Sequence, residues 1–172
     1  GITEGFQLGP VRIIPINWVI GIVVFSVLVT LVRHGADPPQ WILFVSERDG
    51  NWDIFRMRAD GSDQRNLTHH PASDDDPHWA PDGLQIAFAS DRSGNFEIWV
   101  IPAMGGEATQ VTDEGGVVPT WSPDGSQLVF WSNRTGNRQL WIMAADGSNL
   151  YSLSQTGYDD WDPVWIKYTD PP

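Results

Sequence analysis

Hydrophobic residues dominate one stretch near the start of the chain. Between Arg12 and Arg33 lie twenty residues without a charge, and fifteen of them are Ile, Val, Leu, Phe or Trp. A helix of that length is about 30 Å long, which matches the hydrocarbon core of a bilayer. A buried core helix is rarely apolar on all sides, and the apolar part of a signal peptide runs to about 15 residues. The pattern therefore predicts a transmembrane helix over residues 13–33, with Trp18 near one headgroup region and available to a partner.

After residue 40, hydrophobic and polar residues alternate in short stretches that are separated by turn residues. Alternation over four to eight residues is typical of β-strands. In the middle of the chain it predicts strands over residues 84–90, 96–101, 108–112 and 117–121. The segment between the first two strands contains Gly and Asn, which tolerate the positive φ of a tight hairpin. The sequence thus predicts a series of antiparallel strands.

This strand pattern recurs along the chain. The sequence Trp-Ala-Pro-Asp-Gly at 79–83 returns as Trp-Ser-Pro-Asp-Gly 42 residues later, and a third Trp follows after another 44. The residues that define the repeat are Trp79, Pro81, Asp82, Gly83, Trp121, Pro123, Asp124, Gly125 and Trp165. We divide the segment 41–167 into three units, over about 41–79, 80–121 and 122–165. Four short strands in about 40 to 45 residues are typical of one β-propeller blade.

Composition excludes several classes of function. The formal net charge is −12, from 22 acidic and 10 basic side chains, so a basic groove for nucleic acid is not expected. The chain has no Cys, which excludes disulfides, thiolate zinc sites and iron–sulfur clusters. It also lacks a Gly-x-Ser-x-Gly elbow, a phosphate loop and a dinucleotide fingerprint. We therefore predict no catalytic residue and no cofactor.

The candidate ligands for a metal ion lie in an acidic stretch of the first unit. Asp74, Asp76 and His78 carry the oxygen and imidazole ligands that divalent cations use. Their spacing is irregular and no supporting polar groups are evident around them, so a solvated loop is the alternative. We predict no metal here and keep these three residues as the candidates to inspect.

Two groups can be distinguished among the ten Trp residues. Trp79, Trp121 and Trp165 recur at the repeat period, so we expect them to fill the space between neighbouring blades. Three others do not recur as Trp in the sister units, and exposed Trp is a common anchor in protein interfaces. The predicted partner-binding residues, besides Trp18 in the membrane segment, are Trp52, Trp131 and Trp161.

Together these motifs resemble the TolB-type repeat, a WD-like propeller blade. The resemblance rests on the Trp-Ser-Pro-Asp-Gly turn, the apolar strand ending in Phe-x-Ser, the Arg-x-Gly-Asn hairpin and the Asp-Gly before the last strand, and it covers residues 41–167. It implies an all-β fold of four-stranded antiparallel units, here an incomplete, open, three-bladed propeller preceded by one transmembrane helix. Blades of this kind occur in TolB-like scaffolds of the cell envelope and in the gating domains of prolyl oligopeptidases.

The sequence departs from a closed ring at both ends of the repeats. A tail over 1–12 precedes the helix, and the linker over 34–40 stands where the innermost strand of the first blade would be. Only a tail over 168–172 follows the third unit. Closed propellers use four to eight blades. We therefore expect three blades to be held within a larger assembly, or the chain to be part of a longer protein.

These patterns favour a non-catalytic structural or accessory subunit of a bacterial membrane complex. The acidic segment after the helix fits the periplasmic side of the inner membrane better than the anionic cytoplasmic leaflet. The expected partners are integral membrane subunits, as in respiratory or photosynthetic energy-transducing assemblies, and the lipid around the helix, but no nucleic acid. Two alternatives stay open: a Tol-like periplasmic receptor for peptides or lipoproteins, and the regulatory propeller of a peptidase.

Overall fold

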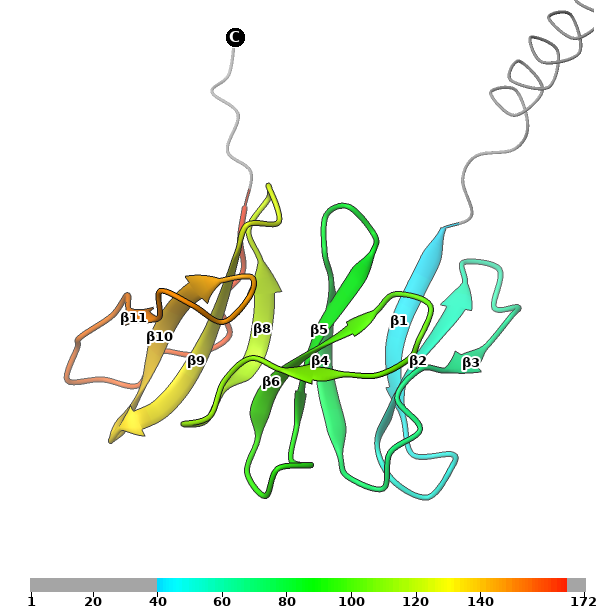
Figure 1. Cartoon of the computed structure of the whole chain (residues 1–172), viewed down its shortest axis with the longest axis horizontal. Helices are drawn as coiled ribbons and strands as arrows, with labels where there is room; N and C mark the ends of the chain where they lie inside the picture. Colours follow the sequence, from blue (N-terminus) through cyan, green and yellow to red (C-terminus); the bar gives the residue numbers. More distant parts are fainter. Residues whose placement is uncertain (1–39, 167–172) are drawn as a thin grey trace, which may run out of the picture. The chain divides into compact units, whose positions relative to one another are not determined.

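The computed structural model describes residues 40–166 of the 172-residue chain. The predicted membrane helix over 13–33, with Trp18, lies outside the described residues. Across 40–166, no helix is long and apolar enough to cross a membrane. This part of the chain consists of eleven β-strands in three antiparallel sheets, which stand side by side like an opened fan (Figure 1). The all-β, antiparallel prediction is confirmed.

Each sheet is a meander, in which strands that follow one another in the sequence pair with one another. The first sheet contains β1 (Trp41–Ser46), β2 (Asp53–Arg58) and β3 (Arg65–Asn66). The second contains β4 (Asp74–Trp79), β5 (Gln85–Ser90), β6 (Glu97–Pro102) and β7 (Thr109–Gln110). The third contains β8 (Val117–Trp121), β9 (Gln127–Thr135), β10 (Asn137–Ala144) and β11 (Tyr151–Ser152).

The sheets are offset by one strand from the sequence units. The strand that ends at Trp79 begins the second sheet, and the strand that ends at Trp121 begins the third. The reason is the Pro-Asp-Gly turn, which joins the first and second strands of one sheet. In the second sheet the amide of Gly83 donates to the carbonyl of Ala80 at 2.9 Å, with a φ of +73° that glycine adopts without strain. The first sheet therefore has three strands within the described residues.

The first strand of each complete sheet contains a bulge. Pairing of β4 with β5 shifts register around Asp76, and pairing of β8 with β9 shifts around Val118. Both residues have left-handed backbone, with φ of +51° and +53°, and each precedes a proline. Asp tolerates this conformation, but a β-branched side chain is rarely found there. The bulge therefore places backbone strain at Val118.

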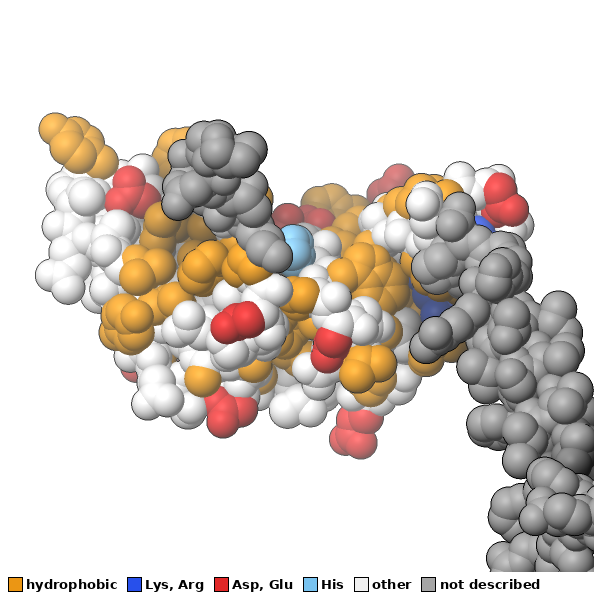
Figure 2. Space-filling model, turned by 90° about the horizontal axis from the view of Figure 1, so that it is seen from above, with side chains coloured by type: hydrophobic (Ala, Val, Ile, Leu, Met, Phe, Trp, Pro, Cys, Tyr) orange, Lys and Arg blue, Asp and Glu red, His pale blue; other side chains and the backbone are white. Residues whose placement is uncertain are grey.

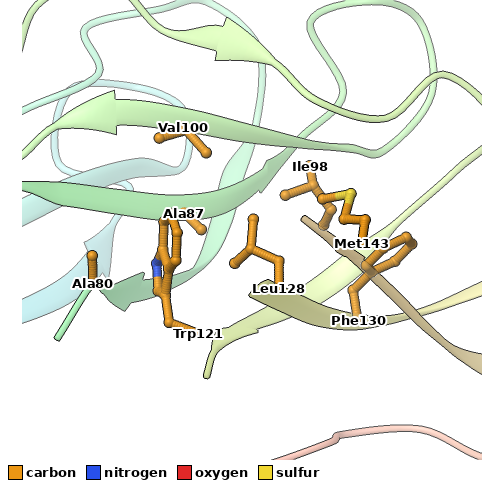
Figure 3. Close-up of a cluster of buried hydrophobic side chains, with 8 residues drawn as sticks. All are labelled: Ala80, Ala87, Ile98, Val100, Trp121, Leu128, Phe130 and Met143. Carbon is orange, nitrogen blue, oxygen red and sulfur yellow. The ribbon is translucent and has the colours of Figure 1, made fainter. Parts of the chain in front are cut away.

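Buried side chains fill the two spaces between neighbouring sheets. Between the second and third sheets the cluster is formed by Ala80, Ala87, Ile98, Val100, Trp121, Leu128, Phe130 and Met143 (Figure 3). Gly116 lies against this cluster, and a Cβ at that position would be 2.8 Å from Cγ1 of Ile98. Between the first and second sheets the cluster contains Ile54, Leu67, Ile86, Phe88 and Ile101. The core is thus a series of blade-to-blade interfaces.

Each sheet has an arginine, at an equivalent position of the repeat, that lies over two aromatic rings. The guanidinium of Arg92 is 5.2 Å from the ring centroid of Phe88 and 4.9 Å from that of Trp99. Its Nε donates to Oγ of Ser90 at 2.9 Å, and its Nη2 donates to Oδ1 of the fully buried Asp74 at 2.8 Å. Arg48 and Arg134 repeat the ring contacts and the serine bond in the other sheets.

A polar side chain at or near the start of β2, β6 and β10 holds the loop that follows its sheet. In the second sheet this residue is Glu97, which is buried and accepts hydrogen bonds from Oγ1 of Thr112 at 2.6 Å and from the amide of Gly115 at 2.8 Å. Asp53 and Gln139 fill the same place in the other two sheets. These bonds hold the loop that leads from one sheet to the first strand of the next sheet.

Candidate functional site

The predicted partner-binding tryptophans lie on different parts of the described chain. Trp52 is exposed in the hairpin between β1 and β2. Trp131 is half-buried on β9, and Trp161 is exposed in the segment after β11. The structure therefore brings two of the three near the third sheet, while Trp52 belongs to the first. Their role in binding stays a prediction.

Arg138 joins the two tryptophans of the third sheet. Its guanidinium is 5.0 Å from the ring centroid of Trp131 and 5.5 Å from that of Trp161. A cation over an indole face gains about 0.5–1 kcal/mol at an exposed site. Sequence reasoning missed this residue, although the positions of Trp52 and Phe96 in the sister hairpins match that of Arg138 and could have drawn attention to it.

Exposed hydrophobic side chains are concentrated at the end of the described chain. Of the twelve large hydrophobic residues that are exposed within 40–166, seven lie between residues 150 and 166. They are Leu150, Tyr151, Leu153, Tyr158, Trp161, Val164 and Ile166. We call these seven residues the apolar end. Figure 2 shows the face on which the Pro-Asp-Gly turns lie. Hydrophobic side chains are exposed over several parts of this face, with carboxylates between them.

The three candidate metal ligands do not converge. Asp74 is fully buried and pairs with Arg92, whereas Asp76 lies in the bulge of β4. Burial raises the pKa of Asp76, and the charges of Asp75 and Asp162 act in the same direction. Burial also lowers the pKa of the imidazole of His78. Among the described residues, no group of three or more His, Asp or Glu side chains is placed to hold a metal ion.

Two hollows of the described surface are lined by both polar and apolar side chains. One of about 360 Å³ lies between the second and third sheets and includes Phe96, Glu97, Asp113 and Glu114 in its lining. Another, of about 520 Å³, is lined by Thr, Ser, Asn and Gln side chains of β10, β11 and their loops, together with Trp141. Neither lining contains a His or Cys. The structure thus offers shallow hollows of mixed lining together with the apolar end.

Comparison with known proteins identifies the type of repeat. The family model described as the TolB beta propeller domain matches residues 37–118. Residues 37–118 therefore match TolB-type β-propeller repeats. A comparison with curated proteins gave no match. The matched segment covers the first sheet, the second sheet and the start of β8, so it spans the blade-to-blade interface that contains Leu67 and Phe88.

Solved structures agree with the TolB-type assignment. A protein described as TolB from Agrobacterium tumefaciens is 27% identical with a TM-score of 0.67, over 73% of this chain and 46% of that one. TolB from Acinetobacter baumannii is 22% identical with a TM-score of 0.60, over 71% of this chain and 31% of that one. A puromycin hydrolase shares the fold at 19% identity and a TM-score of 0.55, over 70% of this chain and 21% of that one. This chain therefore spans less than half the length of each of these proteins.

Proposed function

We propose that this chain is a non-catalytic, protein-binding accessory subunit of a bacterial membrane complex. Its TolB-type domain docks on partner proteins at the periplasmic face, and the segment 13–33 anchors it in the inner membrane. The observation that carries the proposal is the exposure of Tyr158, Trp161, Val164 and Ile166 on the segment after β11, because exposed apolar surface marks protein-interaction sites.

The packing of the other sheets supports a docking role for the apolar end. Between the second and third sheets, Phe130 and Trp121 are almost completely buried by the neighbouring sheet. Beyond the third sheet, Trp161 and Val164 are exposed on the segment that follows β11. A partner that covered this segment would remove apolar side chains from water, as the second sheet does for the third.

The cluster of Arg138 with Trp131 and Trp161 supports the same role. Tryptophan and arginine are enriched among residues that contribute most to binding energy in protein interfaces. Here the two rings hold the guanidinium in place before any partner arrives. A preorganised side chain loses less conformational entropy on binding, which favours affinity.

Copurification tests the proposal directly. The full chain is extracted in mild detergent and the mass of the intact assembly is measured. We expect integral membrane subunits in stoichiometric amount, with respiratory and photosynthetic complexes as the first classes to examine. The variant Tyr158→Ser, at a side chain that is 81% exposed, is expected to lose partner protein. Leu84→Ser, at a side chain that is 69% exposed in the turn between β4 and β5, serves as the control.

Two results would refute parts of the proposal. A chain that purifies without other proteins, or whose partners stay bound equally well in Tyr158→Ser, would exclude docking through the apolar end. Protease treatment of intact spheroplasts tests the side of the membrane. Cleavage of the TolB-type domain only after lysis would exclude the periplasmic placement.

A further inference from the structure

One arginine of the first sheet is buried beside a very weak hydrogen-bond acceptor. Arg56 lies on β2 and is 3% exposed. Among the described residues, no carboxylate oxygen lies within 4.0 Å of its guanidinium. Its Nη1 donates to the sulfur of Met104 at 2.9 Å, and its Nε has no hydrogen-bond partner there. A buried charge is costly unless it is paired, and a thioether sulfur accepts hydrogen bonds only weakly. The described residues therefore leave this guanidinium poorly compensated.

The sister sheets show that this position does not need an arginine. Arg56 lies opposite Leu43 in the pairing of β1 with β2. At the equivalent register the second sheet has Val100 and the third has Ile142. Both side chains are buried, so an apolar residue fills this place in the repeat. Arg56 thus adds a charge that the blade itself does not require.

The guanidinium lines a hollow between the first and second sheets. The hollow has a volume of about 240 Å³ and is lined by Trp41, Arg56, Trp79, Gly83, Ala103 and Met104. The guanidinium carbon is 4.4 Å from the ring centroid of Trp41. Met104 is 73% exposed, and its unbranched side chain adapts easily to a new neighbour. The hollow therefore combines one buried positive charge with aromatic walls and a movable side chain.

We propose that this hollow binds the free C-terminal carboxylate of a partner protein whose last residue is apolar. The carboxylate replaces the sulfur of Met104 as acceptor and forms a charge-assisted pair with the guanidinium of Arg56. The last side chain of the partner packs against the rings of Trp41 and Trp79. This site is separate from the apolar end and adds a second kind of recognition to the proposed docking function.

The composition of the hollow favours a chain end over other anions. Its lining contains no second basic side chain among the described residues, so a phosphate dianion would be only partly compensated. The net charge of the chain is −12, which repels a partner segment rich in Asp and Glu. A single carboxylate beside an apolar side chain matches both the one positive charge and the aromatic walls.

Calorimetric titration with peptides tests the proposal. The full chain in mild detergent is titrated with a short acetylated peptide that ends in leucine and has a free carboxylate. We expect saturable binding at one site per chain. The same peptide with a C-terminal amide should bind at least about tenfold more weakly, because it cannot form the charge-assisted pair. An amidated peptide with an internal aspartate should be weaker by a similar factor, because its carboxylate is not at a chain end.

Two matched variants identify the charge that is responsible. Arg56→Val introduces the residue that β6 has at this register, and it should abolish binding without lowering Tm, because the sister sheets bury an apolar side chain here. Arg65→Val makes the same change in charge on the adjacent strand β3. Arg65 is exposed and pairs with Asp63 at 2.7 Å, so this variant should bind the peptide as the parent chain does.

Several results would overturn the inference. They are the absence of binding to the parent chain, equal affinity for the free acid and the amide, and unchanged affinity in Arg56→Val. Equal affinity for the peptide with the internal aspartate would overturn the assignment to a chain end. The comparison of acid with amide uses the unchanged chain, so it decides the question even if Arg56→Val does not fold. Because the titration involves no membrane partner, its failure would leave the proposed accessory function standing. Conversely, peptide binding by a chain that copurifies with no other protein would support this site and count against the accessory role.

Discussion

Replacing Arg92 by leucine is expected to destabilise the TolB-type domain far more than the same change at Arg48. Both guanidiniums lie over two aromatic rings and donate to a serine hydroxyl. They differ in the third partner. Arg92 pairs at 2.8 Å with Asp74, whose side chain is fully buried, whereas Arg48 bonds to the exposed amide of Gln64. The sequence repeat thus supplies a matched control for a buried ion pair.

The expected magnitudes follow from burial. Removing one partner of a buried ion pair leaves an uncompensated charge and costs about 3–5 kcal/mol. Asp74 has no alternative partner among the described residues, because its Oδ2 accepts no hydrogen bond there. Arg48→Leu removes an exposed cation–π contact worth about 0.5–1 kcal/mol. For a domain of this size, Arg92→Leu should lower Tm by about 10 °C, since each kcal/mol shifts Tm by about 2–4 °C.

Urea unfolding followed by tryptophan fluorescence measures the free energy of unfolding of each variant. Adding Asp74→Asn to Arg92→Leu should recover part of the loss, because it removes the charge that is left without a partner. Equal effects of Arg92→Leu and Arg48→Leu would refute the reasoning. They would mean that the ring contacts and the serine bond, which the two arginines share, carry the whole contribution.

Three further changes have defined expectations. Gly116→Ala should cost about 1–3 kcal/mol in urea unfolding, because its Cβ would lie 2.8 Å from Ile98 in a packed core. Val118→Asn should raise the free energy of unfolding by about 1 kcal/mol, since Asn tolerates a φ of +53°. Hydrogen bonds from Ser122 and Ser126 lower the pKa of Asp124 to about 2, so Ser122→Ala should raise that pKa in an NMR titration. Because the folded pKa is the lower one, the destabilisation by Ser122→Ala should be present above pH 4 and fade as the pH falls toward 2.

The sequence predicted the strands and turns well because their signals are local. The Pro-Asp-Gly turn needs a residue that accepts a φ of +73°, and Gly83 supplies it within the motif itself. The alternation that predicted a strand over 84–90 appears as β5. The division of the sequence into units did not predict where each sheet begins. A repeat period gives the length of a unit, but it does not show which strand of the unit is the first strand of a sheet.

Contacts between strands were harder to predict. Phe44, Phe88 and Phe130 each precede a Ser and then an Arg at the same spacing, and this recurring Phe-x-Ser-x-Arg pattern was the available signal for the stacked arginines. The pattern contains only the first of the two rings around each arginine. The second ring comes from the next strand, and its position could not be read from the pattern. The surroundings of the acidic stretch could not be predicted either. A bulge at Asp76 changes the direction of the chain between Asp74 and His78, so neighbours in sequence have separate surroundings.

The outermost strands β3, β7 and β11 are only two residues long. A strand of that length offers too few free amides and carbonyls for an extended segment of another protein to pair with it and extend the sheet. Many β-rich proteins aggregate by pairing the edge strands of neighbouring molecules. The short outermost strands of this fold disfavour such pairing.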